Sequence, residues 1–289
     1  MHRIFVFLLT ALALPLTAQT ADPVIDQARA LINSNQAAKA SEILEKAVAA
    51  KPNDAPRHYW LGSAYGVIAQ QAGMLKAASM AGKVRDEFAK AVELDPNYLD
   101  ARFGLLEFYL RAPGFMGGDD DKARAQAAEI RKRDAFAGHR AFAIIAATKN
   151  DPTAARNEYV ALVRENPTSA KAHYQYALFL MLNDKNYKVA GDELDAALRL
   201  DPNYISATFQ IGHLAALSSS NFPRGEEALQ KYLTAKPGDD DPPLHRAHYW
   251  LGVIYEKQGK RNDAKAQFET SLRTRADQKD VKEALKRVS

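Results

Sequence analysis

The chain has 289 residues, of which 47% are hydrophobic, and this composition is sufficient for a packed core. It contains no cysteine, which excludes disulfides, thiolate metal sites, a cysteine nucleophile and a lipid anchor on a mature N-terminal cysteine. The formal net charge is only +4 and the charges are dispersed, so nucleic acid is not an expected partner.

Residues 1–21 have the pattern of a secretory signal peptide. A short positive start precedes an almost uninterrupted apolar run at 4–16, and small residues follow it. Because about 20 apolar residues are needed to span a bilayer, a cleaved leader is favoured over a retained anchor. We expect cleavage after Ala18 or Ala21 and export to a periplasm or to the outside of the cell. No later segment of the sequence is apolar enough to cross a membrane.

Two short segments occur twice in the chain. The pentapeptide LDPNY stands at Leu94–Tyr98 and at Leu200–Tyr204, and HYWLG stands at His58–Gly62 and at His248–Gly252. Such self-similarity predicts repeated helical units that stack into a solenoid, since one unit cannot bury its apolar face alone. Solenoids offer extended binding surfaces and seldom carry catalysis.

The clearest unit runs from His245 to Ala276. Its characteristic residues are Leu251-Gly252, Tyr255, Gly259, Ala264, Phe268 and Leu272. This pattern resembles the tetratricopeptide repeat (TPR), in which small residues let two helices cross closely and a proline usually ends the second helix. The resemblance implies an all-α, right-handed α-solenoid of helix-turn-helix units, with the first helix of each unit lining a concave groove.

Aligned with this unit, the chain divides into seven helix pairs and a capping helix. The expected units are approximately 21–54, 55–98, 99–135, 136–169, 170–204, 205–239 and 245–278, with the cap at 279–289. The cap has Val281, Leu285 and Val288 at helical spacing, so it would cover the last exposed apolar face.

The second unit is about ten residues longer than the last. Tyr65 and Phe88 are 23 residues apart, whereas the equivalent Tyr255 and Phe268 are 13 apart. Ten residues are close to three helical turns, so the insertion lengthens the hairpin without turning its apolar face. Longer helices that pack on a neighbour explain this insertion. The alternative is a protruding hairpin with adaptable apolar contacts, namely Met74, Leu75 and Met80.

The third unit inserts about five residues between its helices, within 111–122. Pro113 ends the first helix, and three consecutive aspartates begin the second, where carboxylates cap free N–H groups. A calcium loop fits less well, because EF-hand ligands alternate and finish with a glutamate. A partner-binding tip that uses Phe115 and Met116 is a further alternative. The aspartates at 239–241 are expected in a solvated linker.

Four of the seven histidines hold the same place in their units: His58, His139, His173 and His248. Metal ligands converge within about 2–2.5 Å of one ion, whereas equivalent positions in successive units are about 8–10 Å apart. We therefore expect packing residues and no metal site. Motifs for phosphate loops, dinucleotide binding, zinc proteases and serine hydrolases are also absent. A non-enzyme without a cofactor is expected.

The fifth residue of each unit is expected to line the groove. These residues are Ile25, Tyr59, Phe103, Arg140, Tyr174, Phe209 and Tyr249. Five aromatic rings would form a ladder for an extended peptide or an amphipathic helix. Packing of the rings against the next unit is the alternative. Polar residues that could orient a ligand are Glu107, Arg140, Lys171, His213, Arg246 and Lys257.

These features predict a non-enzymatic adaptor or scaffold that binds a protein or peptide partner in the groove. One alternative is a carrier or sensor of a small apolar ligand or lipid. Another is an accessory subunit of an envelope assembly or secretion machine that makes contact through the long second unit. A receptor for chaperone C-terminal tails is not expected, since no three successive units supply the Lys and Asn residues that such TPR proteins use.

Overall fold

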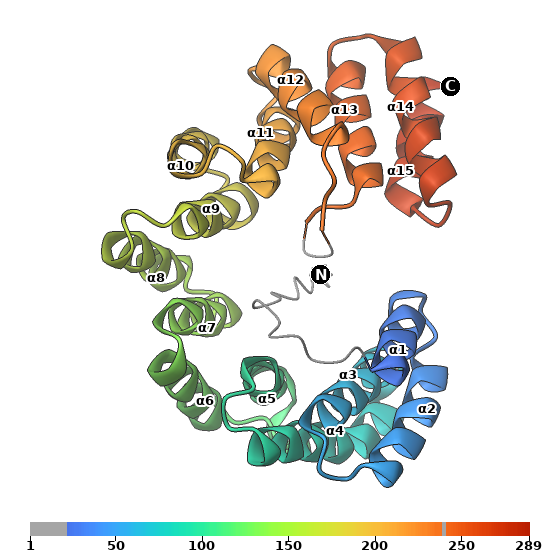
Figure 1. The fold of residues 1–289 in the computed structure, drawn as a ribbon, viewed down its shortest axis with the longest axis vertical. Helices are drawn as coiled ribbons and strands as arrows, with labels where there is room; N and C mark the ends of the chain where they lie inside the picture. Colours follow the sequence, from blue (N-terminus) through green and yellow to red (C-terminus); the bar gives the residue numbers. More distant parts are fainter. Residues whose placement is uncertain (1–21, 239–240) are drawn as a thin grey trace. The chain divides into compact units, whose positions relative to one another are not determined.

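The structure is a computed structural model that describes residues 22–238 and 241–289. The predicted signal peptide lies outside these residues. The described residues form fifteen α-helices and no strand, which confirms the all-α solenoid class (Figure 1). The helices are α1 (Pro23–Asn33), α2 (Ala37–Ala50), α3 (Ala55–Gln71), α4 (Met74–Leu94), α5 (Leu99–Arg111), α6 (Asp120–Arg133), α7 (Ala135–Thr148), α8 (Pro152–Glu165), α9 (Ala170–Phe179), α10 (Tyr187–Leu200), α11 (Ile205–Ser218), α12 (Phe222–Leu233), α13 (Leu244–Lys257), α14 (Arg261–Thr274) and α15 (Lys279–Val288). A 3₁₀ turn, η1 (Gly114–Met116), and a short π-helical segment, η2 (Leu180–Asp184), complete the described secondary structure.

The chain divides into two compact units, an N-terminal unit that ends at Ala161 and a C-terminal unit that begins at Leu162. In the N-terminal unit each helix from α1 to α6 packs on the next one. The first helices of successive hairpins also touch, as α1 with α3, α3 with α5, and α5 with α7. The C-terminal unit repeats this arrangement, with α11 against α13 and with α15 covering α13 and α14. Contacts between neighbours only are the mark of a helical-repeat solenoid.

The repeated pentapeptide LDPNY makes the same turn twice. Helix α4 ends at Leu94 and α10 ends at Leu200, and an aspartate follows each of them. The Asp95 carboxylate accepts a hydrogen bond from the N–H of Asn97 at 2.9 Å, and Asp201 accepts one from Asn203 at 3.0 Å. Aspartate favours such local turns over a continuing helix, and proline cannot extend the helix hydrogen bonding. The turn therefore fixes where the tyrosine that closes the pentapeptide lies.

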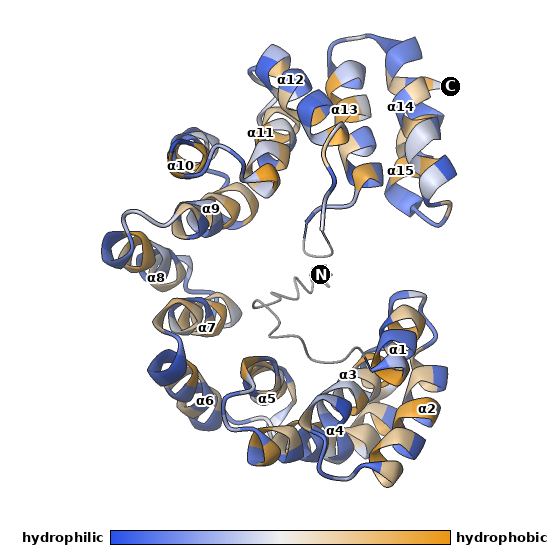
Figure 2. Ribbon diagram, viewed as in Figure 1, coloured by the Kyte–Doolittle hydropathy of each residue, from blue (hydrophilic) through white to orange (hydrophobic). Residues whose placement is uncertain are grey.

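Glycines allow the two helices of a hairpin to approach closely. A Cβ atom added to Gly252 on α13 would lie 2.5 Å from Phe268 on α14, and one added to Gly212 would lie 2.2 Å from Leu229. Phe268 and Leu229 are fully buried, so the large side chain fills the space that the glycine leaves. Figure 2 shows that the helices carry an apolar side and a polar side, as this packing requires.

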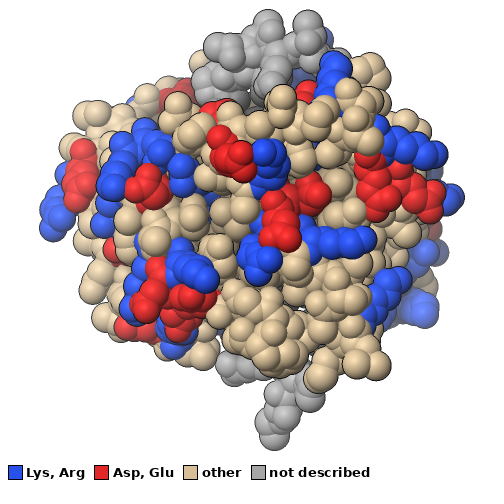
Figure 3. Space-filling view, turned by 90° about the horizontal axis from the view of Figure 1, so that it is seen from below, with Lys and Arg blue, Asp and Glu red and all other residues tan. Residues whose placement is uncertain are grey.

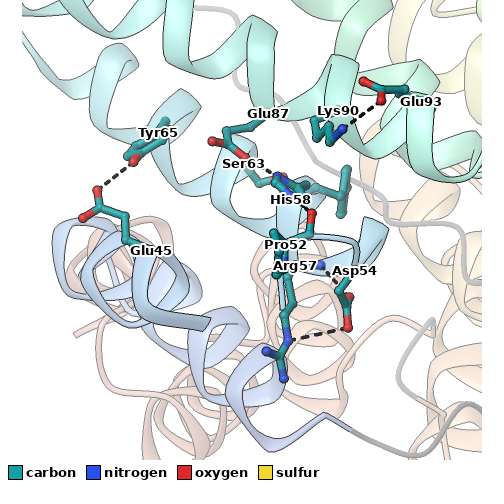
Figure 4. Close-up of polar contacts among 11 residues, drawn as sticks. Glu45, Pro52, Asp54, Arg57, His58, Ser63, Tyr65, Glu87, Lys90 and Glu93 are labelled. Carbon is teal, nitrogen blue, oxygen red and sulfur yellow. Dashed lines mark hydrogen bonds and ion pairs between the residues drawn. The ribbon is translucent and has the colours of Figure 1, made fainter. Parts of the chain in front are cut away.

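The four equivalent histidines tie the two helices of their hairpins together by polar contacts. His58 Nδ1 lies 2.6 Å from Glu87 Oε2 on α4, and His58 Nε2 lies 2.9 Å from the carbonyl oxygen of Pro52 (Figure 4). The equivalent Nδ1 contacts join His139 to Glu158 (2.8 Å), His173 to Glu193 (2.6 Å) and His248 to Gln267 (2.7 Å). Each histidine is thus a structural tie within one hairpin.

The long second hairpin ends in an exposed apolar tip. Only two residues separate α3 from α4, and α4 has 21 residues. Met74 and Leu75 at the start of α4 are 74% and 89% exposed. Met80, by contrast, packs on the core that α1 to α5 share, so its expected role as an open contact is corrected.

The turn between α5 and α6 also has an exposed ring. Asp119 accepts hydrogen bonds from the N–H groups of Asp121 and Lys122, each at 3.0 Å, and so caps α6 as expected. Phe115 in η1 is 78% exposed. Met116, which was expected beside it at a binding tip, packs instead on the same core as Met80.

The described surface has charges of both signs. On the face shown in Figure 3, Lys and Arg side chains are interspersed with Asp and Glu. Among the described helices, none combines the length and the apolar character that a bilayer crossing needs.

Candidate functional site

Two of the predicted groove aromatics are core residues. Phe103 is 7% exposed and packs with Leu106 and Ile130. Phe209 is 4% exposed, and its ring centroid lies 5.2 Å from that of Tyr232. The expectation that these two rings are open to a partner is therefore corrected, because the neighbouring helix covers them.

Two other predicted groove tyrosines pair with the tyrosines of the LDPNY turns. The ring centroids of Tyr59 and Tyr98 are 5.2 Å apart, and those of Tyr174 and Tyr204 are 4.9 Å apart. All four rings are half-buried. Burial raises the pKa of each phenol, so the hydroxyl groups stay protonated and can donate hydrogen bonds. The rings of each tyrosine pair pack against each other between successive hairpins, and their hydroxyl groups remain available as hydrogen-bond donors.

Arg140 is a charged groove residue whose buried Nε has no acceptor among the described residues. Its Cζ lies 4.0 Å from the ring centroid of Phe103, which is a cation–π contact. No hydrogen bond or ion pair joins its guanidinium to another described residue, and its buried Nε has no acceptor. Burial lowers the pKa of Arg140, while Tyr159, Asp100 and Glu107 raise it by charge interactions.

The acidic groups near Arg140 do not neutralise it by contact. Glu107 makes its ion pair with Arg111, at 3.1 Å. Asp100 lies beyond ion-pair distance of Arg140, and burial raises the pKa of its carboxyl although Arg140 lowers it in part. We name the residues of this site the arginine cluster: Tyr59, Tyr98, Asp100, Phe103, Glu107, Arg140 and Tyr159.

The corresponding face of the C-terminal unit is bonded within itself. The His213 ring stacks on Trp250 with centroids 4.0 Å apart, and its Nδ1 lies 2.9 Å from Gln210 Oε1. Burial, with a smaller contribution from Arg246, lowers the pKa of His213 to about 4. Arg246 lies 4.3 Å from the ring centroid of Tyr249, and it forms a 2.6 Å ion pair with Asp280.

Two further residues in this unit have structural roles. Lys257, expected to orient a ligand, donates hydrogen bonds to the carbonyl oxygen of Ala216 and to the hydroxyl of Ser219, both at 2.7 Å. It therefore ties the end of α13 to the end of α11. Asp241 lies in the linker between α12 and α13 as expected, but it is half-buried and accepts hydrogen bonds from the Ser206 hydroxyl and from the N–H of Gly238. The other two aspartates of this linker, at 239–240, lie outside the described residues.

Sequence reasoning missed three members of the arginine cluster: Tyr98, Asp100 and Tyr159. Tyr98 and Asp100 stand at the junction of α4 and α5, and the repeated LDPNY segment was the signal that marked this junction. Tyr159 lies on α8, a second helix of its hairpin, and no spacing in the sequence connects it with Arg140.

Comparisons with known proteins agree on the fold. Sequence profiles described as tetratricopeptide repeat match residues 140–205 in one version and residues 25–54 and 245–278 in another. No curated protein sequence matches the chain.

Three solved structures illustrate the likeness. A tetratricopeptide repeat protein from Parabacteroides merdae is 13% identical, with a TM-score of 0.53 over 92% of this chain and 97% of that one. Yeast Tom70 is 15% identical, with a TM-score of 0.56 over 88% of this chain and 58% of that one. The anaphase-promoting complex assembly Cut9–Hcn1 is 14% identical, with a TM-score of 0.52 over 94% of this chain and 50% of that one. This chain thus spans half of the length of the Cut9–Hcn1 chain, and such identities show the fold alone.

Proposed function

Because this chain belongs to the tetratricopeptide repeat family, we propose that it is a non-enzymatic adaptor that binds a partner protein along the inner face of its first helices. The observation that carries the proposal is the arginine cluster. It combines half-buried tyrosine rings with a guanidinium that forms no ion pair with any described residue.

These groups suit a peptide better than a small apolar molecule. Tyrosine offers rigid apolar area together with a hydroxyl, and arginine offers a charged fork, and both are enriched where proteins bind proteins. An apolar carrier would need a closed apolar pocket, whereas Asp100, Glu107 and Arg140 bring charge to this site. The absence of nucleotide, hydrolase and protease motifs from the sequence supports the non-enzymatic part.

A photo-crosslinking amino acid at position 98 tests the proposal in cells that express the chain. Tyr98 belongs to the arginine cluster, so irradiation should join a partner protein to position 98, and mass spectrometry identifies it. Position 75 is the matched control, since Leu75 is 89% exposed but lies on the tip of the long hairpin. Adducts at 98 and none at 75 support groove binding.

The exposed tip favours a second candidate function. Met74 and Leu75 leave two adjacent large apolar side chains exposed, and exposed apolar patches mark contacts with other proteins. In this case the chain is an accessory subunit that docks through the long hairpin. Adducts at position 75 and none at 98 would support this candidate and contradict the first.

We place the adaptor in an exported compartment, as the sequence of residues 1–21 predicts. N-terminal sequencing of the mature chain from fractionated cells tests this part. A mature start directly after Ala18 or Ala21 in the exported fraction supports it, and an uncleaved chain in the cytoplasm contradicts it.

A further inference from the structure

The N-terminal unit satisfies its two buried arginines, Arg57 and Arg102, within the fold. Arg57 donates to the Asp22 carboxylate at 2.9 Å and to the carbonyl oxygen of Ala47 at 2.8 Å. Arg102 donates to the carbonyl oxygen of Pro96 at 2.8 Å and to a glutamine side chain at 3.2 Å. Both arginines therefore have clear structural roles.

Arg140 differs from these two residues. Arg140 is half-buried, and the Nε–H of its guanidinium is buried without a hydrogen-bond acceptor. A buried donor without an acceptor costs free energy, so native proteins rarely leave one. Phe103 covers the guanidinium on one side, and this contact supplies no acceptor along the edge of the fork.

The nearby acids are engaged elsewhere or lie too far away. Asp134 caps α7 by accepting from the N–H of Ala137 at 2.9 Å, and Glu107 pairs with Arg111. Asp100 acts on Arg140 only through longer-range charge interaction. The fold therefore holds the guanidinium in place but leaves its Nε–H for an acceptor from outside.

The planar shape and the positive charge of the Arg140 guanidinium determine which external acceptor fits it. A carboxylate accepts two parallel N–H bonds from a guanidinium, and this planar match gives both strength and orientation. The tyrosines of the cluster supply apolar contact for residues on either side of such a carboxylate. We infer that Arg140 binds the side-chain carboxylate of an Asp or Glu residue in an extended segment of the partner protein. This inference rests on the proposed function.

Nuclear magnetic resonance of the arginine Nε–Hε groups tests the anion site directly. The probes are N-acetyl-glutamate N-methylamide and its neutral glutamine equivalent, which differ only in the carboxylate. The Arg140 signal should shift saturably with the glutamate probe, with at least about tenfold weaker binding of the glutamine probe. An equal response to both probes overturns the inference.

Two variants assign the effect to one side chain. Arg140→Gln keeps a polar side chain of similar length without the charged fork, and it should abolish discrimination between the probes. Arg246→Gln is the matched control, because Arg246 also lies over an aromatic ring but is paired with Asp280. Circular dichroism and the melting temperature confirm that both variants fold. Discrimination that survives in Arg140→Gln overturns the inference.

A peptide array separates this inference from the proposed function. The array holds C-terminally amidated twelve-residue peptides in pairs, with each acidic residue also present as its amide. Binding that prefers the acidic member, and that loses this preference in Arg140→Gln, supports both proposals. Binding without preference overturns the carboxylate inference alone. A saturable Arg140 signal without any peptide binding overturns the proposed function while the anion site stands.

Discussion

Arg140 in the N-terminal unit and Arg246 in the C-terminal unit both lie over aromatic rings, 4.0 Å from the centroid of Phe103 and 4.3 Å from that of Tyr249. Arg246 also has Asp280 at 2.6 Å, whereas no described residue forms an ion pair with Arg140. The comparison shows that a cation over a ring is a packing feature common to both units. The lack of an ion-pair partner distinguishes Arg140 from Arg246 and makes Arg140 the candidate binding residue.

The tyrosine pairs strengthen this comparison because they are alike in the two units. Tyr59 with Tyr98 and Tyr174 with Tyr204 have similar separations and follow from the same turn sequence. The polar groups around the pairs differ. The serine, glutamine and aspartate near Tyr174 bond to one another or to the tyrosine, while Arg140 near Tyr59 does not.

The largest expected effect is a loss of stability when a predicted groove ring that lies in the core is removed. Phe209→Ala removes a buried ring from the C-terminal unit, and Phe103→Ala does the same in the N-terminal unit. Each should lower the free energy of unfolding by about 3–5 kcal/mol, measured by urea titration with far-ultraviolet circular dichroism. Tyr174→Phe, which keeps its ring, serves as a control with a small effect. A loss below about 1 kcal/mol at Phe209 would restore the interpretation of an open ladder.

A smaller effect concerns His213, whose stacked position belongs to the C-terminal unit. Its pKa is lowered from 6.5 to about 4 in the folded chain, so between these values the unfolded chain binds the proton first. Stability therefore falls as the pH falls through this window, by about 3 kcal/mol. His213→Phe keeps a ring on Trp250 and should remove this part of the pH dependence in urea titrations. An unchanged slope would show that the histidine is not held neutral.

The hydrogen-bond partners of the equivalent histidines differ between the two units, and the side chain of one unit can be replaced by that of the other. His58 bonds to a carboxylate on Glu87, whereas His248 bonds to the amide of Gln267. Glu87→Gln converts the first tie into the second and should cost about 1 kcal/mol of unfolding free energy, because a charge-assisted bond becomes a neutral one. Gln267→Glu is the reverse change. A higher melting temperature in Glu87→Gln than in the unchanged protein would contradict the stabilising role assigned to the contact between His58 and Glu87.

The smallest expected effect is at the tip of the long hairpin. Replacing Met74 and Leu75 together by serine should change the free energy of unfolding by no more than about 0.5 kcal/mol, because both side chains are mostly exposed. Urea titration measures this change, and crosslinking from position 98 should be unaffected. A loss of several times that size would mean that the tip packs within the fold.

The sequence was sufficient for features that depend on local pattern. The all-α repeat fold and the cap on α6 followed from spacing and from a helix-start signal, whereas the exposed Met74 was expected only as the alternative to helices that pack on a neighbour. Phe103 and Phe209 could not be placed in the same way. The fifth residue of a unit stands between the groove and the next hairpin, and a small rotation of the helix decides which side its ring takes.

Contacts between distant residues were also beyond sequence reasoning. Glu87 lies 29 residues after His58, and nothing in the spacing marks it as the partner of that histidine. Arg140 was expected in the groove on repeat register alone. Its lack of a counter-ion depends on the distances to Asp100 and Glu107, and these follow from how α5 and α7 pack rather than from local pattern.

Calorimetric titration with the tightest acidic peptide from the array tests the central comparison most directly. The comparison predicts that Arg140→Gln weakens binding at least about tenfold, which corresponds to about 1.4 kcal/mol, while Arg246→Gln changes it less than about twofold. Equal losses in the two variants, or a greater loss in Arg246→Gln, would contradict the assignment of Arg140 as the residue that binds the partner's carboxylate.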